Sequence, residues 1–136
     1  MRLAAGSAAL AALSLAAVAR AEDIPRCPLL PPVEEAEASK LPPILAAALI
    51  KDLGQIALPG APFDATGHAK DGVNHRLIWV RRQGTRWVAA VEEGGATYRD
   101  VVLAYELGYD GSLAGVRRDI AFPATVCQVT ERDLWR

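Results

Sequence analysis

The sequence has few of the residues on which most enzyme mechanisms depend. Its 136 residues include two cysteines, two histidines and four serines, and two of the serines fall within residues 1–21. It contains no G-x-x-x-x-G-K-[ST], G-x-G-x-x-G, H-E-x-x-H or G-x-S-x-G motif and no EF-hand spacing. Because a nucleophilic enzyme needs a nucleophile beside a base, this inventory offers little for catalysis. It excludes a motif-bearing nucleotide binder, and we expect no cofactor.

Acidic residues are absent from residues 1–21, which form a basic start followed by an alanine-rich apolar run. The run is shorter than the ~20 apolar residues needed to cross a bilayer, and Ala19 and Ala21 stand where a signal peptidase recognises small residues. We predict a signal peptide over residues 1–21 and an exported protein, periplasmic or secreted, with no stable membrane insertion after cleavage. Cleavage would leave 115 residues with 13 basic and 16 acidic side chains, enough for one domain. Twelve arginines against three lysines fit a bacterial protein.

Cys27 and Cys127 are the only cysteines, and they lie near opposite ends of the predicted mature chain. Neither has a C-x-x-C partner or a nearby histidine, so their spacing does not favour a metal or catalytic role. In an oxidising compartment the two would form a disulfide. In the chain-entropy model, a disulfide that closes so long a loop stabilises the fold by roughly 4 to 5 kcal/mol.

Proline is concentrated just after the predicted signal peptide, where it removes backbone donors and helical freedom. We predict an extended Pro-rich strap over residues 22–42, followed by a single domain over residues 43–136 that the disulfide closes to the strap. A proline at the first helical position, apolar residues every three to four positions and Gly54 predict a short amphipathic helix over residues 43–53. Residues 55–74 show no sustained period, and so long a loop usually has a function or is mobile.

Short apolar runs separated by glycine turns follow from residue 75 onward. This pattern predicts an antiparallel β-meander of at least four strands with the helix packed on one face, an α+β fold. We expect residues 125–136 to return along the sheet edge and bring Cys127 to the strap. The predicted strands are residues 75–82, 86–92, 98–107 and 113–122.

The first predicted hairpin is rich in arginine and tryptophan. A three-residue turn would place Arg81 opposite Trp87 with Trp79 diagonal to them, giving one arginine-aromatic face. A two-residue turn would put the tryptophans on opposite faces. The alternative to a binding face is that one tryptophan fills the core while the arginines are solvated. Such a face would suit an unknown protein or an anionic small molecule, whereas the net acidity of the mature chain argues against nucleic acid. The predicted binding face comprises Trp79, Arg81, Arg82, Arg86 and Trp87.

His68, Asp71 and His75 are spaced three and four residues apart in or beside the long loop. Imidazole and carboxylate ligands suit Zn²⁺ or Cu²⁺, so these three residues are a candidate metal site. A polar loop also collects such residues by chance, because no strict motif accompanies them.

Carboxylates are the only potentially catalytic side chains that are numerous in this sequence. A two-carboxylate hydrolase leaves no spacing rule in a sequence, because the fold sets the distance between the two groups. Next to Gly94 and Gly95, however, adjacent Glu92 and Glu93 also fit a solvated turn. The candidate carboxylates on the predicted strands are Glu92, Glu93, Asp100 and Glu106.

Gly95, Ala96, Thr97 and Tyr98 resemble the short S-G-A-x-Y signature of small secreted bacterial lysozyme inhibitors, which are β-rich. Gly94 stands where that signature has its serine, and the match covers four residues. We expect a non-catalytic binding or interaction module. Two alternatives stay open: an inhibitor of an exogenous hydrolase such as lysozyme, and a small carboxylate-based or metal-assisted hydrolase.

Overall fold

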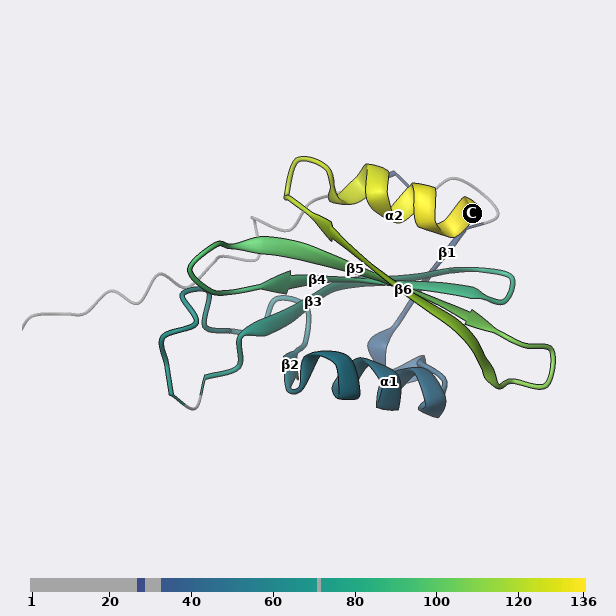
Figure 1. The fold of residues 1–136 in the computed structure, drawn as a ribbon, viewed down its shortest axis with the longest axis horizontal. Helices are drawn as coiled ribbons and strands as arrows, with labels where there is room; N and C mark the ends of the chain where they lie inside the picture. The colour runs from purple at the N-terminus through teal and green to yellow at the C-terminus, as the bar shows by residue number, and fades with distance from the viewer. Residues whose placement is uncertain (1–26, 29–32, 71) are drawn as a thin grey trace, which may run out of the picture.

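The computed structural model describes residues 27–28, 33–70 and 72–136. In this part of the chain one sheet lies between two helices, α1 on one face and α2 on the other (Figure 1). The strand order is β1-β3-β4-β5-β6, and the short β2 also pairs with β3. The elements are β1 (Glu34–Ala36), a 3-10 turn (Ala38–Lys40), α1 (Pro43–Leu53), β2 (Ile56–Ala57), β3 (His75–Gln83), β4 (Arg86–Glu93), β5 (Arg99–Leu107), β6 (Leu113–Ala121) and α2 (Val126–Trp135).

The predicted α+β class is confirmed, with β3, β4, β5 and β6 forming the antiparallel meander. The predicted helix over residues 43–53 is also found. Pro43 occupies its first position, where a missing N–H costs nothing. Gly54 ends it with a φ of 75°, a value that favours glycine, and its N–H donates to the carbonyl of Ile50 at 2.8 Å. Local signals therefore determine both ends of α1.

The expectation that residues 125–136 return along the sheet edge is wrong. They form α2, which covers the face opposite α1 (Figure 1), so the sheet has two buried faces where we expected one. The buried positions of α2 include Thr130 and Asp133, which interrupt the apolar stripe. Asp133 is buried because Arg117 of β6 donates to its Oδ1 at 2.9 Å. A polar residue at a buried position, paired with a residue far away in the sequence, thus obscures the apolar periodicity that would have predicted α2.

Two apolar cores fill the spaces between the sheet and its helices. Because both faces are covered, β4 and β5 each contain six consecutive buried residues and lack the alternation of a half-exposed strand. The α1 core comprises Leu45, Leu49, Leu53, Leu77, Val80, Trp87, Ala89, Val91, Val101, Leu103 and Tyr105. The α2 core comprises Ile78, Trp79, Val88, Ala90, Val102, Ala104, Ala121, Val126 and Leu134.

The predicted disulfide between Cys27 and Cys127 is present, with the two Cα atoms 5.5 Å apart. It ties the strap to the first turn of α2. Disulfides are typical of proteins in oxidising compartments. In the ranges that the structure describes, no helix has the length and apolarity needed to cross a membrane. The predicted signal peptide over residues 1–21 lies outside the described residues, as does the start of the strap.

Candidate functional site

The outer edge of β3 is covered at its two ends and open between them. β1 pairs antiparallel with β3 as far as Val80, and β2 pairs in parallel with His75 and Arg76. Residues 77–79 have no paired residue on this side among the described part of the chain. Such an edge presents backbone N–H and C=O groups that can pair with another chain.

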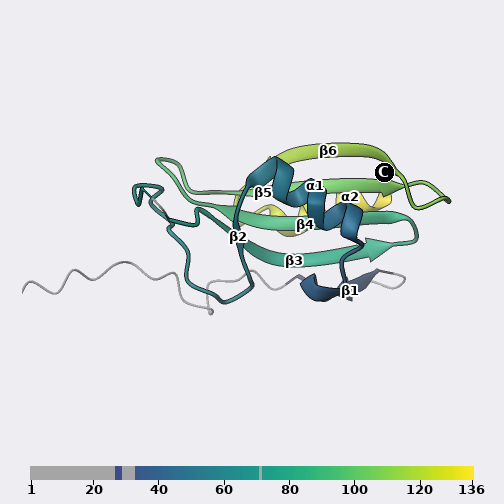
Figure 2. The ribbon, with the colours of Figure 1, turned by 90° about the horizontal axis from the view of Figure 1, so that it is seen from below.

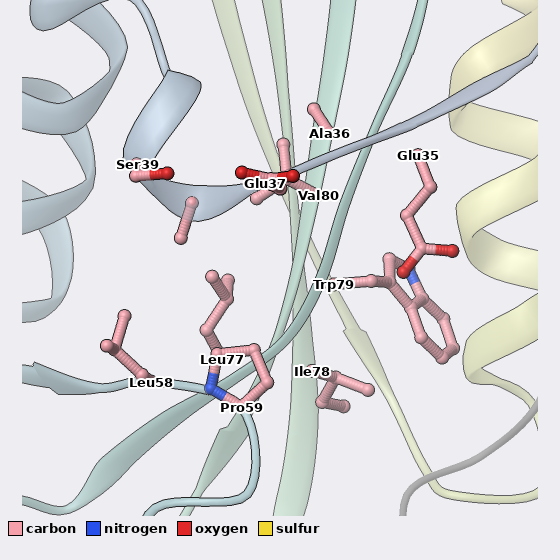
Figure 3. A pocket seen from close by; sticks show the side chains of 11 residues that line it. Glu35, Ala36, Glu37, Ser39, Leu58, Pro59, Leu77, Ile78, Trp79 and Val80 are labelled. Carbon is pink, nitrogen blue, oxygen red and sulfur yellow. The ribbon is translucent and has the colours of Figure 1, made fainter.

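A groove of about 800 Å³ lies along this open edge and is open to solvent (Figure 3). β3 forms its floor, the end of β1 and the 3-10 turn form one wall, and the residues that follow β2 form the other. Leu58 stands on this second wall with 63% of its surface exposed. A smaller apolar hollow of about 180 Å³ shares Leu58 and Leu77 with the groove and extends to Ile50 of α1. The site is therefore mainly apolar, with a backbone edge at its base.

Two carboxylates and one indole add polarity to the groove. Glu35 and Glu37, at the end of β1, line it and are exposed, while Glu37 also pairs with Lys40 at 3.4 Å. The Trp79 indole lies beside Glu35 at the end of the groove nearer α2 (Figure 3). Its Nε1 is buried and has no hydrogen-bond partner among the described residues. A ligand would thus meet negative charge at this end, next to a largely buried indole.

The β3–β4 turn separates the two tryptophans of the predicted binding face. Gly84 and Thr85 form a two-residue turn, so the three-residue turn that a shared face requires is not formed. Trp79 lies in the α2 core and Trp87 in the α1 core, and 5% and 7% of their surfaces are exposed. The tryptophans therefore fill the interior on opposite sides of the sheet.

Arg81 is buried with Trp79 on the α2 side. Its guanidinium carbon lies 4.5 Å from the Trp79 ring centroid, and its Nη2 donates to the carbonyl oxygen of Cys27 at 3.0 Å. Burial lowers the pKa of this arginine, against the opposing effect of Glu35. Arg81 thus attaches the strap to the sheet beside the disulfide.

The two remaining arginines of the predicted face form ion pairs within the chain. Arg82 donates from Nε to Glu34 at 2.8 Å, and Arg86 donates from Nε to Glu106 at 2.7 Å. Both pairs are partly exposed, so each contributes little stability. The structure does not bring the five predicted residues onto one surface, and of the five it places only Trp79 in the groove.

The candidate metal ligands are not brought together in the described part of the chain. Asp71 lies outside the described residues. His68 is exposed in the loop, whereas His75 is half-buried with its Nε2 3.9 Å from Glu93. Burial lowers the pKa of His75. Across residues 27–28, 33–70 and 72–136, no group of three His, Cys, Asp or Glu side chains could hold a metal ion.

Two of the candidate carboxylates meet in the interior. Glu92 and Asp100 lie opposite each other in the β4–β5 pairing, and 1% of each is exposed. Arg76 and the Tyr98 hydroxyl both donate short hydrogen bonds to Glu92. Both oxygens of Asp100 lack a partner among the described residues, and burial next to Glu92 raises the pKa of Asp100 to about 7. Such a pKa suits acid-base chemistry, but the burial leaves a substrate no access to the pair.

The long loop between β2 and β3 covers this carboxyl pair. Arg76 donates from Nη1 to the carbonyl oxygen of Ala61 at 3.3 Å, and its guanidinium carbon lies 4.5 Å from the Phe63 ring centroid. The loop is fastened to the β4–β5 turn, where Gly95 N–H donates to the carbonyl of Ala65 at 3.1 Å. The loop therefore packs over the buried Arg76–Glu92 ion pair.

The four residues that resemble the lysozyme-inhibitor signature lie in and just after the β4–β5 turn. Their tyrosine, Tyr98, donates a hydrogen bond from its hydroxyl to the buried Glu92, while 36% of its own surface is exposed. This internal bond gives Tyr98 a packing role in the chain.

No family model, curated protein sequence or solved structure matches this chain. The functional conclusion therefore depends on the geometry of the groove.

Proposed function

We propose that the protein is a non-catalytic binding module whose ligand is a short extended peptide lying along β3 in the groove. One observation carries this proposal: within the described part of the chain, residues 77–79 of β3 are left unpaired between β1 and β2, at the base of an apolar groove. Proteins that bind peptides by strand addition use such an edge for main-chain hydrogen bonds and neighbouring hollows for side chains.

The length of the open edge limits the segment that can bind. Three strand residues span roughly 10 Å, so about three residues of a peptide would pair with β3 before meeting β1 or β2. Ala36 and Ala57, the last paired residues on either side, limit that length. The module would thus recognise a short segment of a partner and not a long strand.

The groove walls favour a particular ligand chemistry. Leu58 and Leu77 would accept an apolar side chain, because their shared hollow extends toward α1. Glu35 and Glu37 would attract a lysine, an arginine or a free amino terminus at the other end, and such charge-assisted bonds strengthen in a partly enclosed site. The acidic rim therefore favours an apolar-basic peptide over an anionic small molecule, one of the two kinds of partner expected from the sequence.

An array of immobilised hexapeptides with randomised central positions tests this function. We expect the full chain to select peptides that join an apolar residue to a basic one. Fluorescence anisotropy with the selected peptides, labelled in solution, then gives the affinities. Leu58→Lys should weaken binding about tenfold or more, because it removes an apolar contact and repels the basic residue. Ile120→Lys is the matched control, since Ile120 is also exposed but lies on the opposite edge strand.

Two results would contradict the proposal. One is an array without sequences enriched above background. The other is equal affinity of the selected peptides for the Leu58→Lys and Ile120→Lys variants. Glu35→Gln supplies a further check, because it should reduce the preference for basic residues while leaving the apolar preference in place.

The alternatives predicted from the sequence have less support in this geometry. A carboxylate-based hydrolase would need access to Glu92 and Asp100, which are buried. An inhibitor of an exogenous hydrolase would present a side chain to its target, and Tyr98 of the resembling segment is bonded to Glu92. A lysozyme turbidity assay with added protein tests the inhibitor directly, and unchanged lysis over a wide range of ratios would dismiss it.

A further inference from the structure

The second edge of the sheet is longer and more open than the first. β6 (Leu113–Ala121) has nine residues and pairs only with β5 within the described part of the chain. It lies at one edge of the sheet, and β1 lies at the other (Figure 2). A long edge strand without a partner is a template for pairing with another chain, unless its side chains prevent it.

The side chains of β6 include exposed apolar residues. Val116 and Ile120 lie opposite Tyr105 and Val101 of the α1 core, yet 51% and 54% of their surfaces are exposed. α1 therefore does not cover this end of its own face of the sheet. Phe122, just beyond the strand, is 53% exposed as well.

The charges of β6 are self-complementary in one antiparallel register. If two copies of the strand pair around a two-fold axis, the residue at the axis faces itself, and pairs on either side are equidistant from it. With Arg118 at the axis, Val116 faces Ile120, and Arg117 faces Asp119 of the second copy. Each of these favourable pairs occurs twice because of the symmetry. Within its own chain Arg117 already pairs with Asp119 at 3.3 Å, so the contact across the axis extends an existing ion-pair network.

The neighbouring registers lack this complementarity. With Asp119 at the axis, Arg118 faces an isoleucine. With Arg117 at the axis, Val116 faces an arginine. The central Arg118 pair in the favoured register is tolerable, because each Arg118 donates from Nη2 to its own Glu93 at 3.0 Å and so has a partner for its charge.

We propose that β6 pairs antiparallel with β6 of a second copy of this chain, centred on Arg118, to form a symmetric homodimer with one continuous sheet. The pairing buries Val116 against Ile120 on the α1 side and matches Arg117 with Asp119 on the α2 side. Edge pairing alone buries a small area, so we expect the dimer to dissociate on dilution. The inference is independent of the proposed function, since it concerns the opposite edge of the sheet.

The dimer would place its two peptide grooves at the far ends of the joined sheet. β3 with its groove and β6 lie on opposite sides of the central strands, so pairing through β6 leaves both grooves open. Two grooves held at a fixed separation would bind a repeated or clustered ligand more tightly than one groove alone.

Arg118→Cys in the full chain tests the register. Cα atoms of directly opposed residues in an antiparallel pair are about 4.5 to 5.5 Å apart, a separation that a disulfide can bridge. Mild oxidation should therefore give a covalent dimer on a non-reducing gel. Tyr109→Cys is the matched control, because Tyr109 is fully exposed on the β5–β6 turn and far from the axis. Equal cross-linking of the two variants, or none with Arg118→Cys, overturns the register.

Sedimentation equilibrium across a dilution series tests the dimer without new cysteines. The wild-type mass should rise toward that of two chains with concentration. Ile120→Lys should hold the protein at the monomer mass, because it places a third positive charge beside Arg117 and Arg118, whereas Leu58→Lys should dimerise as the wild type does. A monomer mass for the wild type at every concentration overturns the proposal.

Discussion

Asp100 lies directly opposite Glu92 across β4 and β5, and both carboxyl groups are buried beneath the loop that follows β2. The two groups differ in their partners. Glu92 accepts hydrogen bonds from Arg76 and Tyr98, whereas Asp100 has no acceptor or donor partner among the described residues. Arg76 therefore stabilises the charge of Glu92, whereas the pKa of Asp100 is raised to about 7.

Replacing Asp100 with asparagine should remove a pH dependence of stability. The pKa of Asp100 is raised from 3.8 to about 7, so the folded protein binds a proton that the unfolded chain releases between these values. The free energy of unfolding contributed by this group must fall as pH rises from about 4 to 7, by at most about 4 kcal/mol. Urea denaturation of wild type and Asp100→Asn at a series of pH values measures this fall in the free energy of unfolding.

The difference between the two proteins isolates Asp100 from the other titrating groups. We expect the stability of Asp100→Asn relative to wild type to increase with pH over this window and to be constant below and above it. Asp110→Asn is the control, because Asp110 is exposed and its pKa is lowered by Ser112, so its effect should appear only at acid pH. A constant difference between Asp100→Asn and wild type from pH 4 to 8 would show that Asp100 is ionised in the folded protein.

Breaking the Arg76–Glu92 pair should destabilise the fold strongly. Both side chains are almost fully buried, and removal of one partner takes a buried ion pair from the other, at a cost of about 3 to 5 kcal/mol. Glu92→Gln and Arg76→Met should each show this loss in urea denaturation. The double variant should lose less than the sum of the two, because both single substitutions remove the same ion pair.

Glu92→Gln should also act on its neighbour. The charge of Glu92 contributes to the raised pKa of Asp100, so its removal should move the pH-dependent loss of stability to lower pH. Additive effects of the Arg76 and Glu92 substitutions, together with an unmoved pH transition, would contradict the proposed coupling of these three groups.

Residues that favour helix ends and turns predicted α1 and the strands of the meander. Pro43 and Gly54 mark the ends of α1, and glycine turns separate the strands of the meander. α2 was missed because Asp133 is buried through Arg117 of β6, a contact that no local pattern contains. The pairing of the two cysteines was predicted correctly, because the chain has no other cysteine and an oxidising compartment was expected.

The candidate groove could not be predicted, because it depends on where two short edge strands stop. β1 ends opposite Val80 and β2 ends opposite Arg76, and neither is long enough to give a periodic signal. The β-bulge in β3 is equally hidden: a register shift between Leu77 and Trp79 places Ile78 and Trp79 together in the α2 core.

Loss of the disulfide should lower stability without altering the fold of the sheet. Cys27 and Cys127 are 100 residues apart, so the bond restricts most of the unfolded chain, and its removal should cost about 2 to 5 kcal/mol. The Cys27→Ser/Cys127→Ser variant should show this loss in urea denaturation, with an unchanged far-ultraviolet circular dichroism spectrum. Wild type treated with reductant is the control and should match the variant. Equal stability of oxidised wild type and variant would contradict this prediction.

Gly94→Ala should detach the long loop from the sheet. A Cβ at this position would lie 2.2 Å from the carbonyl oxygen of Asp64 and 2.8 Å from Cα of Ala65, and both of these are backbone atoms that cannot rotate away. Because this loop covers Arg76, we expect faster amide exchange in the loop and a loss of roughly 1 to 3 kcal/mol of stability. Gly115→Ala in β6 is the matched control, since its nearest neighbour would be 3.9 Å away and its stability should stay within about 0.5 kcal/mol of wild type. Loop exchange rates equal to those of the control would mean that the loop does not depend on its contact with the β4–β5 turn.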